Sequence, residues 1–144
     1  MIAVDTNILV YAHRKESPFH QVAAARLNDL ATAPARWALP WPCVHEFLAI
    51  VTNAKVYREP TPLDTALRVI EVLFQQPNCD FLAEGDVHLG ALSELARAGR
   101  TTGAKIHDAR IAAICVAHGV RELWSADRDF SRFPPLRTVN PLVG

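Results

Sequence analysis

The chain has 144 residues, 50% of them hydrophobic, and its 15 basic and 15 acidic residues give a net charge of zero. This size predicts one compact domain over residues 1–144, and the charge balance argues against a strongly basic nucleic-acid coat while leaving room for a local basic rim. No membrane helix or signal peptide is expected, and three cysteines without a C-x-x-C pair favour reduced thiols in the cytoplasm.

The first third of the chain predicts two strands and a helix between them. Residues 2–5 (IAVD) are short and apolar at the start, which suits a central parallel strand buried on both faces. Ser17-Pro18 predicts a helix start, with serine as the N-cap and proline at the first helical position. Apolar residues then recur at helical spacing over residues 19–30. Residues 37–39 form the next candidate strand.

Two further helices are predicted in the middle of the chain. Pro42 opens the first, and Val44, Phe47 and Val51 lie on one of its faces. The segment TPLD at residues 61–64 resembles a capping box, with aspartate in place of the usual glutamate. The apolar stripe of the helix that follows consists of Leu63, Ala66, Leu67, Ile70 and Phe74.

The remainder alternates strands with helices. Residues 79–82 and 120–125 are strand candidates, residues 137–139 form an edge strand, and a helix covers about 86–98. Residues 106–117 are apolar nearly all round, so this helix should be the most buried. The alternation predicts an α/β fold with a mostly parallel sheet covered on both faces. The functional crevice of such folds lies beyond the carboxyl ends of the strands.

Acidic residues distant in sequence fall at this carboxyl-end rim. Asp5 ends the first strand, and Asp127 and Asp129 follow the strand at 120–125. Glu46 and Asp108 lie in the first turns of helices that begin on the same rim. Each acid also has a structural explanation, as a helix cap, a dipole partner or a turn residue. Their joint pattern is harder to explain without a ligand.

Converging carboxylates repel one another unless a cation neutralises them. Oxygen ligands without thiol or imidazole partners favour Mg²⁺ or Mn²⁺. Such an ion can bind a phosphodiester oxygen, lower the pKa of a bound water and stabilise an in-line displacement. The sequence has no glycine-rich phosphate loop and no G-x-S-x-G elbow, so nucleoside triphosphate chemistry and serine hydrolysis have no support.

Four ordered segments resemble the signature segments of a PIN domain, and more narrowly the VapC toxins of bacterial toxin–antitoxin pairs. They are DTNILVYA, PCVHEFLAIVT, HDARIAAICVAHG and LWSADRDFSRF. The resemblance implies a three-layer α/β/α sandwich and an Mg²⁺- or Mn²⁺-dependent endoribonuclease that cleaves RNA with metal-activated water. It also implies a homodimer and a small cognate antitoxin of the VapB kind.

The family's acids carry over to Asp5, Glu46, Asp108 and Asp127, and Asp129 remains an alternative for the fourth. We expect Asp5 and Asp108 to hold the principal metal, Asp127 to support it, and Glu46 to bind a second ion or deprotonate the attacking water. Basic residues near the acidic segments are expected to bind RNA, and they are Arg14, Lys15, Arg110, Arg128 and Arg132.

Three rival interpretations stay open on the sequence. One is a catalytically inactive PIN-like module that binds RNA or a partner, although all four acid positions are filled. Another is a DNA-directed 5′-nuclease, but the chain is short for an added DNA-binding module. The third is a receiver-like signalling domain, which needs an acidic pair after its first strand, where this chain has a single acid.

Overall fold

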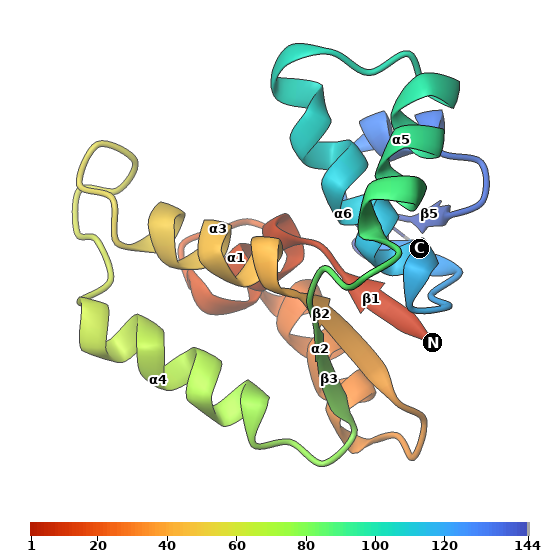
Figure 1. The fold of residues 1–144 in the computed structure, drawn as a ribbon. Helices are drawn as coiled ribbons and strands as arrows, with labels where there is room; N and C mark the ends of the chain where they lie inside the picture. Colours follow the sequence, from red (N-terminus) through yellow and green to blue (C-terminus); the bar gives the residue numbers. More distant parts are fainter. Residues whose placement is uncertain (144) are drawn as a thin grey trace.

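The sheet has five parallel strands in the order β3-β2-β1-β4-β5 (Figure 1), in a computed structural model that describes residues 1–143. The strands are β1 (Ile2–Val4), β2 (Trp37–Pro40), β3 (Cys79–Leu82), β4 (Glu122–Trp124) and β5 (Arg137–Val139). Ile2 is paired with Trp37 on one side and with Glu122 on the other. The apolar start of the chain is therefore the central strand, as its composition predicts.

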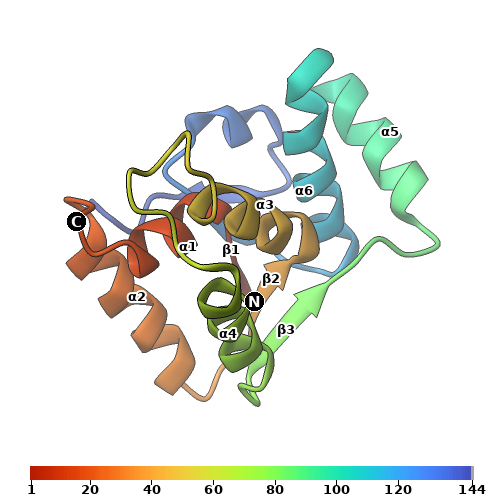
Figure 2. The ribbon, with the colours of Figure 1, turned by 90° about the vertical axis from the view of Figure 1, so that its left-hand side faces the viewer.

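Helices cover both faces of the sheet, which confirms the predicted three-layer α/β/α sandwich. The helices are α1 (Thr6–His13), α2 (His20–Thr32), α3 (Trp41–Val51), α4 (Leu63–Phe74), α5 (His88–Ala98) and α6 (Ile106–Ala117). Figure 2 shows α5 and α6 on one side of the sheet, with α1, α2 and α4 on the other. Successive residues of β1 point to opposite faces of the sheet. Ala3 belongs to the hydrophobic cluster that includes α6, and Val4 belongs to the cluster that includes α1 and α3.

Helix α6 is deeply buried, as its sequence predicts. Its buried residues are Ala109, Ile111, Ala112, Ala113, Ile114 and Cys115. Three of them are alanines, whose small side chains let the helix lie close to the sheet and to α5. No helix within residues 1–143 is long and apolar enough to cross a membrane.

Two predicted helix starts differ from the structure. Helix α2 begins at His20, so Pro18 does not occupy the first helical position, and the Ser17 hydroxyl instead accepts a hydrogen bond from the Phe19 N–H at 3.1 Å. The capping box at residues 61–64 is also absent, because α4 has no side-chain cap. The Thr61 hydroxyl instead contacts His13 Nε2 at 2.9 Å and Arg14 Nη1 at 3.0 Å. In the second case a tertiary contact replaces the local one.

Helix α4 buries less of its apolar stripe than expected. Ala66 and Ile70 are buried, but Leu63, Leu67 and Phe74 are 59%, 37% and 60% exposed. Apolar side chains left in solvent along one helix are typical of a surface that a partner covers.

Candidate active site

The fold delivers the predicted acids to the carboxyl edge of the sheet. Asp5 directly follows β1, and α3, which carries Glu46, begins at the residue after β2. Asp108 lies in the first turn of α6. Asp127 and Asp129 lie at the start of the short 3₁₀ helix η2 (Arg128–Arg132), which follows β4. Since β1 and β4 are neighbours, the first and last acidic segments meet there.

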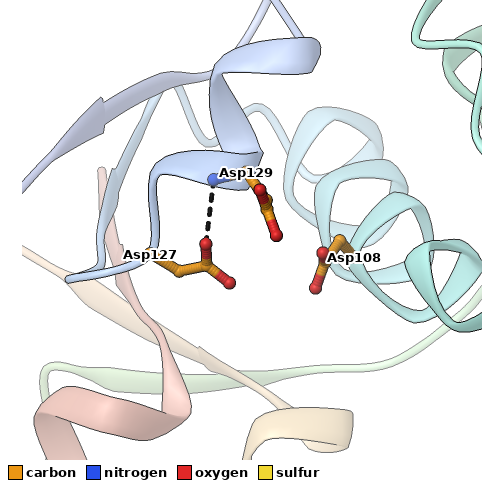
Figure 3. A group of neighbouring side chains, drawn as sticks. All are labelled: Asp108, Asp127 and Asp129. Carbon is orange, nitrogen blue, oxygen red and sulfur yellow. Dashed lines mark hydrogen bonds between the residues drawn. The ribbon is translucent and has the colours of Figure 1, made fainter.

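Three carboxylates form the tightest acidic group. Asp108, Asp127 and Asp129 each offer one carboxylate oxygen within 4.8 Å of the others. Figure 3 shows Asp108 on α6 facing Asp127 and Asp129 on the η2 segment, with the side chains turned toward a common space. One Asp127 oxygen accepts a hydrogen bond from the Asp129 N–H at 2.8 Å, which fixes Asp127 as the cap of η2. Asp127 and Asp129 are therefore both members of this group.

Asp5 lies next to this group and is held from several sides. Its Oδ1 accepts the Thr6 N–H at 2.8 Å, and its Oδ2 accepts the Ser125 hydroxyl at 2.7 Å. The Cys43 thiol lies 3.5 Å from Oδ1. Asp5 is only 6% exposed, and this burial raises the pKa of its carboxyl, with the hydrogen bonds from Ser125 and Thr6 opposing the rise. Asp5 is thus both the N-cap of α1 and an acid of the site, which joins its two sequence interpretations.

Ser125 and Asn7 fasten the two acidic segments together. The Ser125 hydroxyl donates to Asp5 and accepts the Asp127 N–H at 2.9 Å. Asn7 Nδ2 lies 3.3 Å from the same hydroxyl, and Asn7 Oδ1 accepts the Ala126 N–H at 3.2 Å. A small hydroxyl residue after a strand was the only sequence signal for this link. These hydrogen bonds therefore hold the Asp5 carboxylate at a fixed position relative to the backbone of Asp127.

Mutual repulsion is visible in the pKa values of the remaining acids. Burial raises the pKa of Glu46, and the charges of Asp5 and Asp108 raise it further. Burial also raises the pKa of Asp108, and the charge of Asp127 adds to it while Lys105 opposes it. The charges of these acids therefore act on one another, so the acids lie near one another in the fold.

The pocket suits a hard divalent cation. Mg²⁺ takes oxygen ligands at about 2.0–2.1 Å in an octahedron, so oxygens that share one ion lie roughly 3–4 Å apart. The separations of up to 4.8 Å among Asp108, Asp127 and Asp129 are near this range. Asp5, one of the two acids expected to hold the principal ion, lies outside this group of three.

The raised pKa values predict that the metal-free protein loses stability as the pH rises. Above the ordinary pKa values of 3.8 for Asp5 and Asp108 and 4.5 for Glu46, and up to the raised ones, the folded state binds more protons than the unfolded state. The free energy of unfolding therefore falls with rising pH in that window. Urea unfolding in EDTA at a series of pH values measures this fall, and Mn²⁺ at neutral pH should reverse it.

The variant Asp108→Asn separates the effect of Asp108 on the pH dependence of stability from the effects of other acids. Glu16, Asp80 and Glu84 have lowered pKa values because of arginine partners or backbone hydrogen bonds, so they act in the opposite sense. Their contribution is common to the wild-type chain and to Asp108→Asn. We expect the variant to show a flatter decline than the wild type, and equal slopes for the two proteins would contradict the assignment.

The basic residues expected to bind RNA fall into two groups. Arg14 is used inside the fold, because its guanidinium contacts Glu16, Thr61 and the face of Tyr57 at 3.9 Å. Arg110 forms an ion pair with Glu84. Lys15, Arg128 and Arg132 have no ion pair within residues 1–143, and the two arginines are exposed on η2 beside the acids. Arg14 and Arg110 therefore have partners within the fold, whereas the arginines of η2 have none among the described ion pairs.

Comparisons with known proteins identify a family and a fold. The PIN domain family model matches residues 2–135. The chain is 36% identical over 144 residues to Ribonuclease VapC43 of Mycobacterium tuberculosis (strain H37Rv), covering 100% of this chain and 97% of that protein. It is 34% identical to Ribonuclease VapC33 of the same strain, covering 99% of each. VapBC2 from Rickettsia felis, solved with promoter DNA, matches in fold with a TM-score of 0.67 at 19% identity, covering 96% of this chain and 98% of that one.

Proposed function

The chain belongs to the PIN domain family, and from this we propose that it is an endoribonuclease acting as the toxin of a type II toxin–antitoxin pair. The observation that carries the proposal is the meeting of Asp5, Glu46, Asp108 and Asp127 at one sheet edge, in a chain that aligns over its full length with proteins named ribonuclease VapC. We take residues 1–144 as a single nuclease domain working in the cytoplasm. An inactive binding module is disfavoured, because all four acids of the predicted site are present in the chain.

We propose that the activity depends on Mg²⁺ or Mn²⁺. Asp108, Asp127 and Asp129 would hold the ion, and Asp5 would complete its negative environment from the buried side. When bound, the ion supplies an activated water and stabilises the charge of the displacement. Glu46, whose pKa is raised by burial and by its acidic neighbours, is suited to take the proton of the attacking water.

A cleavage assay with end-group analysis tests this function. The purified chain should cut RNA in Mg²⁺ or Mn²⁺ and lose that activity in EDTA. Hydrolysis by water leaves a 5′-phosphate and a 3′-hydroxyl, whereas attack by the RNA 2′-hydroxyl leaves a 2′,3′-cyclic phosphate. Cleavage that persists in EDTA, or a cyclic product, would overturn the metal-based proposal.

We also propose a small antitoxin of the VapB kind as the partner. Helices α1, α2 and α4 enclose an apolar cavity of about 710 Å³, open to solvent, whose lining includes Leu9, Leu27, Val69 and Leu73. An amphipathic segment of a second protein would bury apolar side chains there. A reading frame for a short protein next to the gene would support this partner. A homodimer is proposed on the family resemblance alone.

A further inference from the structure

Lys105 is brought to the acidic group by the short turn that precedes α6. It ends the 3₁₀ helix η1 (Gly103–Lys105), immediately before α6. The turn depends on Gly103, which has a φ of +60°, in the region that glycine adopts most easily. The ammonium of Lys105 forms an ion pair with Asp129, one of the three clustered acids. The lysine thus lies on the rim of the site, although its motif, KIHD, looks like an ordinary solvated helix start.

Lys105 is unusual among the basic residues near the site. Within residues 1–143, no other lysine or arginine forms an ion pair with Asp108, Asp127 or Asp129. Arg14 and Arg110 pair instead with Glu16 and Glu84, which are not members of the group of three. The positive charge closest to the three acids is therefore the ammonium of Lys105, which one of these acids, Asp129, holds in place.

The ammonium keeps capacity for a further partner. A lysine has three N–H donors, and the structure gives Lys105 a single ion-pair partner, Asp129. The side chain is 43% exposed, so the remaining donors can reach a ligand from solvent. An RNA backbone that places one phosphodiester among the acids must pass this rim with its neighbouring phosphates. Lysine binds phosphate as a mobile point charge, which suits this position.

We propose that Lys105, held by Asp129, binds an RNA phosphate next to the one that is cleaved, and so positions the substrate over the acidic group. The inference rests on the proposed ribonuclease function and assigns a substrate contact within it. In the simplest alternative, Lys105 only balances the charge of the acids. Removing it would then change the affinity for a metal ion and leave the binding of RNA unaltered.

Binding and kinetics with Lys105→Gln distinguish the two roles. The binding probe is a short, fluorescently labelled single-stranded RNA of mixed sequence, measured by anisotropy with Mn²⁺ in a Glu46→Gln background that limits cleavage. We expect Lys105→Gln to weaken binding by about tenfold and to reduce the slope of log affinity against log salt by about one. In the chain with Glu46 intact, KM should rise more than kcat falls. Lys105→Arg should recover most of the affinity, because it keeps the charge.

Lys55→Gln is the matched control, because it removes the same charge from an exposed loop between α3 and α4. Its affinity and salt slope should equal those of the parent. If Lys105→Gln also matches the parent in both, and only Mn²⁺ affinity measured by electron paramagnetic resonance changes, Lys105 is a charge-balancing residue and the inference is wrong. A wild-type chain that cuts no RNA with Mn²⁺ would instead refute the proposed function, and the anisotropy result would still decide whether Lys105 binds phosphate.

Discussion

Asp108→Asn is expected to lower metal-dependent RNA cleavage at least about a hundredfold. Mutating a residue that only orients a metal ligand already lowers metal affinity or activity about 10–100-fold, and Asp108 is a proposed ligand itself. The side chain belongs to the group of three carboxylates, and the amide has nearly the same shape but only one oxygen and no charge. Cleavage rates with saturating Mn²⁺ and direct titration of Mn²⁺ binding measure the loss.

The same substitution should not harm the fold. The pKa of Asp108 is raised by burial and by Asp127, so its charge is unfavourable in the metal-free protein, and removing it relieves that repulsion. We expect the free energy of unfolding in EDTA at neutral pH to be equal to or higher than that of the wild type. A loss of activity that accompanies a loss of stability would point to a structural role instead.

Asp64→Asn provides a matched control for Asp108→Asn. Asp64 is also an acid in the first turn of a helix, α4, so both substitutions remove the same favourable interaction with a helix dipole. Asp64 lies away from the acidic group and lines the cavity beside α4. Cleavage by Asp64→Asn should therefore stay close to the wild-type rate. A comparable loss in both variants would remove the special role assigned to Asp108.

The sequence predicted the strands well because they depend on local composition. Short apolar runs mark the parallel strands, and the rule on carboxyl ends brings Asp5 and Asp127 together without coordinates. Hydrogen bonds and ion pairs between residues far apart in the sequence were not predicted. The Ser125 hydroxyl that fixes Asp5 comes from 120 residues away, and the ion pair of Lys105 with Asp129 joins two turns. Their partners are set by loop geometry, which residue periodicity does not encode.

One of the two wrong helix starts, the one at residues 61–64, has a tertiary cause. Thr61 has the right residue type for a cap, but Arg14 and His13 contact its hydroxyl across the fold. A local sequence pattern shows that a side chain can cap a helix. Whether it does so depends on tertiary packing, because a contact with a distant residue can take the place of the cap. Among the acids of the site, tertiary contacts engage Asp5 through Ser125 and Asp129 through Lys105.

Phe130→Ala is expected to destabilise the protein by about 3–5 kcal/mol, the usual range for removing a buried phenylalanine. Phe130 is 1% exposed and lies in η2, immediately after Asp129. Its ring lies 6.4 Å from that of Phe133, and the cluster that contains both rings includes Ala109 and Ala112 of α6. Urea unfolding with and without Mn²⁺ measures the loss.

The consequence for the site follows from where Phe130 sits. Asp127 and Asp129 come from the η2 segment and Asp108 comes from α6, so the Phe130 ring is an apolar anchor between the two elements that carry the three carboxylates. We expect Mn²⁺ affinity to fall about 10–100-fold in Phe130→Ala, as for other residues that orient metal ligands. Phe130→Leu keeps most of the apolar volume and should lose less of both properties, which allows a measurement even if the alanine variant does not fold. Phe19→Ala removes a ring that is 42% exposed and should change neither. Wild-type metal affinity in Phe130→Leu together with a folded Phe130→Ala of unchanged affinity would show that the acids hold their spacing without this anchor.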